Sequence, residues 1–171
     1  MVASGFLPCC IHKNKLYFLF GKEAPTEKEA KGWSDFTGGI HKNENILNAG
    51  IREAVEELTG FLGNETEFKK LLRENGGIYP FVFEDYHIHL FRLDYDDKLV
   101  KYFNNTHKYI YEKLNHKYLQ STTIFEKIEI CWMSVEEAKE RKNEFRPFYR
   151  EILNALLKDT SNIRKFCIKS K

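Results

Sequence analysis

Short runs of aromatic and branched side chains dominate the first part of the chain and return in its middle and near its end. Residues 6–11 and 15–20 are two such runs, separated by His12-Lys13-Asn14, and this arrangement predicts a β-hairpin. The polar residues 21–32 are predicted to form a loop. Further extended segments, rich in residues that favour strands, are predicted at 33–40, 78–93 and 127–132.

Apolar residues recur at helical spacing in the other segments. The predicted helices cover residues 46–59, 66–74, 97–118, 135–143 and 147–158. Gly60 follows the first helix, as glycine often does at a helix C-terminus. The tail, 163–171, is basic and predicted to be mobile. Because strands and helices alternate without a regular repeat, we expect an α+β layered sandwich in which residues 97–118 are a helical insertion before the last strand.

Composition adds bounds to this picture. A chain of 171 residues, 42% of them apolar, can bury one core, and without a repeat or a long linker we expect a single domain over 1–171. The 27 basic and 25 acidic residues give a formal charge of +2, which selects neither nucleic acid nor a membrane. No basic leader or run of about 20 apolar residues is present, so we expect an intracellular, cytoplasmic protein without a membrane partner. The cysteines are expected to be reduced, buried thiols.

Three glutamates share one face of the predicted helix 46–59. At 100° per residue, Glu57 lies near 40° and Glu56 near 300° when Glu53 is set at zero. Apolar side chains occupy the opposite face, so we expect the acidic face to point outward, toward a cleft or solvent. Carboxylates at this spacing repel one another, and a divalent cation removes the repulsion. Oxygen ligands without Cys or His indicate Mg²⁺ or Mn²⁺, which can activate water for attack on phosphorus. The alternative is an ordinary solvated acidic face.

The residues before these glutamates favour the catalytic interpretation. The segment Gly38-x5-Glu44-x7-Arg52-Glu53-Ala54-Val55-Glu56-Glu57 resembles the signature of the Nudix hydrolases, G-x5-E-x7-R-E-U-x-E-E-x-G-U, where U is a bulky aliphatic residue. The resemblance covers about residues 38–60. Two departures are the small Ala54 and an extra residue, since both Leu58 and Thr59 precede Gly60. We expect the insertion to change the helix end and to leave the carboxylates in place.

The resemblance implies a Nudix-type α/β/α sandwich with a mixed sheet, and it implies roles for individual residues. Glu53, Glu56 and Glu57 would hold Mg²⁺ or Mn²⁺, and a backbone carbonyl at Gly38 or Gly39 would join them near the substrate. Arg52 and Glu44 would fix these carboxylates. The general base in this family is a box glutamate or a later carboxylate, for which Glu126 and Glu129 are the main candidates and Glu84 and Asp85 the weaker ones.

Other patterns leave alternatives open. One or two exposed aromatic rings can stack on a nucleobase, and Trp33 and Phe36 are the candidates nearest the motif. His87-x-His89 has a spacing that can bind zinc, although a sheet-face or substrate-contacting role is favoured because no third ligand is apparent. The insertion and the tail are basic, which fits either RNA phosphates or a solvated face.

These observations predict an enzyme that hydrolyses a nucleoside diphosphate linked to another group X. The flanking sequences are also similar to Nudix proteins of large DNA viruses, which makes capped RNA a candidate substrate beside free nucleotides. The alternative function is a catalytically silent Nudix-fold module that binds a nucleotide or RNA. The sequence does not specify the oligomeric state.

Overall fold

A computed structural model describes residues 2–25, 31–115, 117–118 and 125–168. Its centre is a seven-stranded sheet in which the order β3-β2-β1-β6-β5 is extended by β4 beside β1 and by β7 beside β2. Strands β1 and β6 are parallel, and the other pairs are antiparallel. The expected mixed sheet is therefore confirmed. The strands are β1 Ala3–His12, β2 Lys15–Glu23, β3 Trp33–Ser34, β4 Phe36–Gly39, β5 Ile78–Phe83, β6 Tyr86–Arg92 and β7 Lys127–Ser134.

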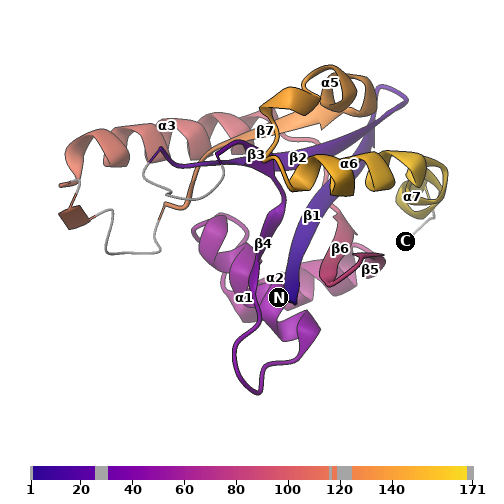
Figure 1. The fold of residues 1–171 in the computed structure, drawn as a ribbon, viewed down its shortest axis with the longest axis horizontal. Coiled ribbons are helices and arrows are strands. Elements are labelled where there is room, and N and C mark those ends of the chain that lie inside the picture. Colours follow the sequence, from indigo (N-terminus) through magenta and orange to yellow (C-terminus); the bar gives the residue numbers. More distant parts are fainter. Residues whose placement is uncertain (1, 26–30, 116, 119–124, 169–171) are drawn as a thin grey trace.

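Helices cover the sheet on both faces, as Figure 1 shows. They are α1 Ile46–Glu57, α2 Glu65–Glu74, α3 Asp97–Lys113, α5 Val135–Glu140, α6 Tyr149–Lys158 and α7 Thr160–Ile168, with a 3₁₀ turn at Lys142–Glu144. The predicted helical insertion is α3, which precedes the last strand, β7. The α+β sandwich expected from the order of elements is thus the observed architecture.

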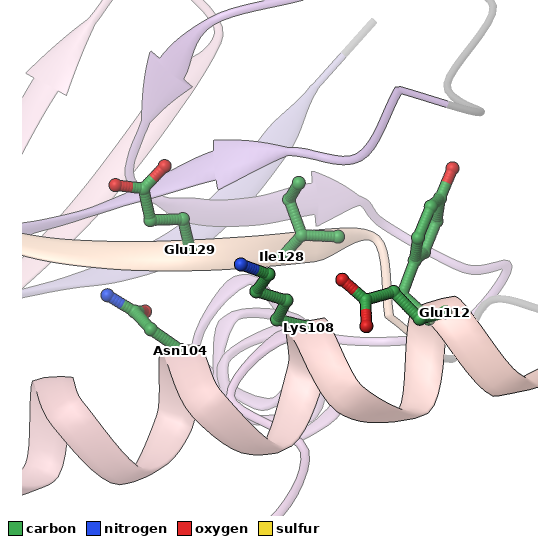
Figure 2. A pocket seen from close by; sticks show the side chains of 6 residues that line it. Asn104, Lys108, Glu112, Ile128 and Glu129 are labelled. Carbon is green, nitrogen blue, oxygen red and sulfur yellow. The ribbon is translucent and has the colours of Figure 1, made fainter.

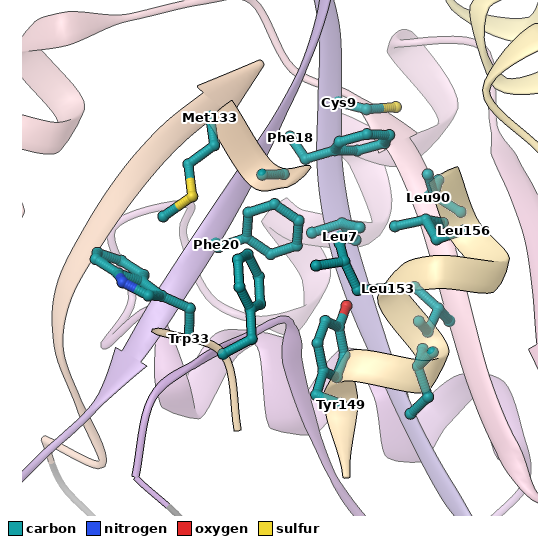
Figure 3. Close-up of a cluster of buried hydrophobic side chains, with 14 of the residues drawn as sticks. Leu7, Cys9, Phe18, Phe20, Trp33, Leu90, Met133, Tyr149, Leu153 and Leu156 are labelled. Atoms are coloured by element: carbon teal, nitrogen blue, oxygen red, sulfur yellow. The ribbon is translucent and has the colours of Figure 1, made fainter. Parts of the chain in front are cut away.

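Each face of the sheet has its own hydrophobic core. On one face, strand residues pack against α5, α6 and α7, and Figure 3 shows this cluster around Phe18, Phe20 and Tyr149. On the other face, α1, α2 and α3 pack through residues such as Ile51, Phe68 and Phe103. The motif helix is therefore fixed against the sheet by its apolar side.

Several predicted boundaries are corrected. The run 78–93 is two strands, because Glu84 takes a left-handed conformation (φ 52°) and turns the chain. The run 33–40 divides at Asp35, and the helix predicted for 97–118 ends at Lys113. The tail predicted to be mobile forms α7 up to Ile168, held by a fully buried Ile163. Residues 169–171 lie outside the described part.

Among the described residues, no helix combines the length and apolarity needed to cross a bilayer. All four cysteines are free thiols, but only Cys9 and Cys10 are buried as expected, whereas Cys131 and Cys167 are partly exposed. The Sγ atoms of Cys9 and Cys167 are 3.4 Å apart.

Candidate catalytic and metal-binding site

Strand β4 and helix α1 bring the motif glycine under the first motif carboxylate. β4 pairs with β1 so that Gly38 lies opposite Ser4, and Asn45 then starts α1 by accepting a hydrogen bond from the Asn48 amide (2.8 Å). A Cβ at Gly38 would stand 2.2 Å from Cδ of Glu53. Only glycine leaves room for the carboxylate at this point.

Arg52 connects four groups of the motif. Its Nε and Nη2 donate to both carboxylate oxygens of Glu44, each at 3.0 Å, and its Nη1 donates to Glu53 (2.6 Å) and to Glu56 (3.3 Å). Nη2 also donates to the Gly39 carbonyl at 3.0 Å. The hydrogen bonds from Arg52 hold the pKa of Glu44 at about 2, so Glu44 stays ionised. The guanidinium thereby fixes the loop, the glycine turn and α1 relative to one another.

Glu57 points toward the sheet, where it meets a buried lysine. Only 5% of Glu57 is exposed, and its Oε1 lies 3.5 Å from Nζ of Lys127, which is fully buried. Lys127 also donates to Glu23 and, at 2.8 Å, to the Ser34 hydroxyl, and Arg146 donates to Glu23 at 2.9 Å. The outward-facing acidic surface predicted from the helix angles is therefore wrong in part. Glu56 is exposed, whereas Glu53 and Glu57 are buried between α1 and the sheet.

Sequence reasoning missed this buried network. Glu23 and Lys127 face each other across β2 and β7 because the register shifts there, with Lys22 opposite Glu129 and Glu23 opposite Lys127. The irregularity turns Lys127 toward α1. An ordinary strand would have placed the next residue, Ile128, opposite Glu23. No feature of the sequence marks such a bulge, so the pairing could not be predicted.

The burial of these carboxylates has an electrostatic consequence. Burial raises the pKa of Glu53, and it raises the pKa of Glu57 well above the usual value. For Glu57, the nearby Lys127 lowers the pKa, whereas the negative charges of Glu23, Glu126 and Asp35 raise it further. Burial alone would lower the pKa of Lys127, but Glu57 and Glu23 outweigh it and raise that pKa. Because burial is the largest cause of the raised pKa of Glu53 and Glu57, a cation bound beside them would stabilise their ionised forms.

The residues present fit a hard divalent cation. Oε2 of Glu57 is buried without a hydrogen-bond partner in the described part of the chain, and Gly38 lets the backbone come close to Glu53. All the atoms that could bind the cation are oxygens, which Mg²⁺ and Mn²⁺ prefer as ligands. Among the described residues, no three His, Cys, Asp or Glu side chains are close enough together to hold a metal. Arg52 bonds both Glu53 and Glu56, and Lys127 faces Glu57, so the three glutamates point to different partners.

The two predicted later carboxylates occupy different places. Glu126 directly precedes β7, next to Lys127, and its charge contributes to the raised pKa of Glu57. Glu129 instead pairs with Lys22 (3.3 Å) and lines a cavity of about 260 Å³ between α3 and β7. Figure 2 shows Asn104, Lys108 and Glu112 of α3 facing this cavity. Glu84 and Asp85 lie in the turn between β5 and β6, where they line another cavity.

Trp33 and Phe36 are not available for stacking on a base in this structure. Trp33 is 1% exposed and packs in one core, and Phe36 is fully buried in the other. Their predicted contact with substrate is corrected for this reason: the Trp33 ring, on the edge strand β3, and the Phe36 ring, on β4, both lie inside the hydrophobic cores. The exposed large aromatic residues include Phe148, Tyr102 and Tyr109.

The two histidines of β6 do not form a zinc site within the described residues. His89 is buried, packs against the Phe6 ring (5.1 Å between centroids) and lies 3.3 Å from the Ser4 hydroxyl, and burial lowers its pKa to about 4. This position of His89 on the sheet corresponds to the sheet-face role that the sequence favours over zinc binding. His107 of α3 is also buried, stacked on Phe103 and 3.0 Å from the Thr59 hydroxyl.

Comparisons with known proteins identify the fold. No family model matches the chain, and no curated protein matches its sequence. Among solved structures, an Ap4A hydrolase from C. elegans in a binary complex matches with a TM-score of 0.54 and 19% identity over 95% of this chain and 98% of that one. The M. smegmatis Nudix hydrolase RenU matches with a TM-score of 0.55 and 12% identity over 95% and 88%. These matches show that the chain has the fold of Nudix hydrolases. They do not bear on the resemblance to viral members of the family.

Proposed function

We propose that this chain is a metal-dependent Nudix hydrolase that splits a phosphoric anhydride bond in a nucleoside diphosphate linked to a group X. The observation that supports this most strongly is the placement of Glu53 and Glu57 beside Gly38 and Lys127, with Glu56 on the same helix, in a chain with the Nudix fold. The expected products are a nucleoside monophosphate and the phosphorylated remainder.

Each motif residue has a proposed part in this reaction. Glu53, Glu56 and Glu57 would hold Mg²⁺ or Mn²⁺ together with the Gly38 carbonyl, since Arg52 already occupies the carbonyl of Gly39. The bound cation supplies positive charge for the phosphate oxygens and lowers the pKa of water. Arg52 keeps Glu53 in place through the Glu44 pair. Glu126 is the better candidate for the general base, because Glu129 pairs with Lys22.

The substrate is proposed at the level of its linkage. The C. elegans neighbour is an Ap4A hydrolase, so dinucleoside polyphosphates join capped RNA and oxidised nucleoside triphosphates as compounds to be tested. A panel of these compounds, assayed for product in Mg²⁺ and in Mn²⁺, identifies the substrate. A decapping enzyme should prefer long capped RNA to a free cap analogue and lose that preference as salt rises, because the extra binding comes from backbone phosphates.

Glu56→Gln and Glu57→Gln test the chemistry with the substrate that the panel selects. Each should reduce turnover by at least about 100-fold, the size of effect that accompanies a displaced or missing catalytic contact. Glu74→Gln, on the exposed side of α2, is the matched control and should retain full activity. Full activity in both motif variants would contradict the assignment. A protein that nucleotide and Mg²⁺ stabilise against melting without product release would instead be a binding module.

A further inference from the structure

Lys127 is a fully buried basic side chain in the described part of the molecule, and nothing in the motif requires it. No other lysine or arginine of the described ion pairs has a fully buried side chain. An ammonium group removed from water is costly unless anions surround it. The structure therefore holds Lys127 in place through its partners.

Those partners belong to the interior end of the proposed site. Lys127 contacts Glu23 of β2 and the Ser34 hydroxyl of β3, and it lies 3.5 Å from Oε1 of Glu57. Arg146 adds a second positive charge beside Glu23 at 2.9 Å. Lys127 and Arg146 thus supply two positive charges beside the Glu23 and Glu57 carboxylates.

The two oxygens of Glu57 have different surroundings. Oε1 faces Lys127, whereas Oε2 has no hydrogen-bond partner in the described residues. A divalent ion placed between Glu57 and Glu23 would meet the Lys127 ammonium at close range. Like charges a few ångströms apart repel each other strongly in a buried environment, where water screens them little.

We propose that Lys127 is a resident cation that positions Glu57 and excludes a divalent ion from the space between Glu57 and Glu23. It holds Oε1 and leaves Oε2 for the metal that Glu53 and Glu56 share. The inference rests on the proposed function, because it assumes that Glu57 is a metal ligand. With Lys127 in place, the chain therefore binds one divalent ion fewer than the same buried carboxylates would bind without it.

Lys127→Gln tests the proposal through metal binding. The number of Mn²⁺ ions bound per chain is counted by electron paramagnetic resonance, and the melting temperature is measured in chelator and in Mn²⁺. The variant should melt lower than the wild type in chelator, since Glu23 and Glu57 lose their counter-charge. It should bind one more Mn²⁺ per chain and recover more stability on Mn²⁺ addition than the wild type does.

Two further variants sharpen the result. Lys22→Gln removes the neighbouring lysine of the same strand pair, which bonds Glu129 and is 44% exposed, and it should leave the Mn²⁺ count unchanged. Glu23→Gln/Lys127→Gln removes both charges of the interior pair. This double variant should not bind the additional Mn²⁺ expected for Lys127→Gln, because Glu23 has lost its charge. It should reach half-saturation at a Mn²⁺ concentration at least about tenfold lower than the wild type, because Glu57 no longer shares its charge with Lys127.

An unchanged Mn²⁺ count in Lys127→Gln, together with wild-type half-saturation in the double variant, would overturn the proposal and leave Lys127 as a packing element. If Lys127→Gln does not fold, the half-saturation of the double variant alone decides. Failure of the proposed function gives a different result: the wild type itself would then bind no Mn²⁺ and release no product.

Discussion

At the scale of the residue, Asp35 shows how strongly burial controls charge beside this site. The side chain is fully buried, accepts a hydrogen bond from the Tyr86 hydroxyl at 2.7 Å, and leaves Oδ2 without a hydrogen-bond partner in the described residues. Burial raises the pKa of Asp35 to about 6, although Tyr86 and Lys127 oppose the shift. The folded protein therefore holds a proton on Asp35 more tightly than the unfolded chain does.

This shift predicts a stability that falls with pH. The contribution is complete below the unfolded pKa, near 4, and is lost as pH rises toward 6, because the folded state must then carry an unpaired buried charge. Asp35→Asn keeps the acceptor for Tyr86 and removes the charge. Its free energy of unfolding should match that of the wild type near pH 4 and exceed it by up to about 3 kcal/mol at pH 7. Chemical denaturation at several pH values measures the difference.

The matched control is Asp94→Asn, since Asp94 is exposed. Its free energy of unfolding should follow the wild-type pH dependence. A difference between Asp35→Asn and the wild type that stays constant from pH 4 to pH 7 would show that Asp35 does not titrate in this range.

At the scale of the element, α1 depends on what stands at its two ends. Its carboxylates fit only because Gly38 lies beneath Glu53. The predicted one-residue insertion lies beyond Glu57. It places Thr59 (φ 48°) and Gly60 (φ 72°) in left-handed conformations after the last turn. The hydroxyl of Thr59 is held by His107 of α3, so the insertion belongs to the junction between α1 and α3.

Two glycine variants separate these ends. Gly38→Ala should lower turnover by at least about 100-fold, because the new Cβ displaces the Glu53 carboxylate, and a misplacement of about 1 Å can cost that much. Gly60→Ala is the matched comparison. Its Cβ meets nothing within 4 Å, so it should cost only about 1–2 kcal/mol of stability from the left-handed backbone and leave turnover unchanged. Equal turnover in the two variants would mean that Gly38 does not support the chemistry.

The residues of α1 explain which part of the site could be predicted. Helical periodicity puts Glu53, Glu56 and Glu57 on one face, and the spacing to Gly38 and Arg52 is local in sequence. The same angles could not show that Glu57 turns inward, because that depends on Lys127, 70 positions later and displaced by a bulge. Local patterns thus indicate the acidic helix, and only the tertiary structure shows how its charges are balanced.

At the scale of the whole molecule, the sheet separates two cores and brings the distant parts of the site together. The antiparallel pairing of β2 with β7 places Glu23 beside Lys127, and the pairing of β1 with β4 carries Gly38 to α1. The hairpin, the motif helix and the helical insertion were predictable from apolar periodicity. The division of 78–93 into two strands and the folding of the tail as α7 were not, because a left-handed turn at Glu84 and the burial of Ile163 decide them.

The central claim is that α1 and the glycine turn bind a divalent cation for hydrolysis of a phosphoric anhydride. Anomalous diffraction from crystals soaked in Mn²⁺ tests it most directly. The account predicts a manganese peak bounded by the carboxylates of Glu53, Glu56 and Glu57 and the carbonyl of Gly38. The absence of a peak beside these groups at millimolar Mn²⁺ would contradict it.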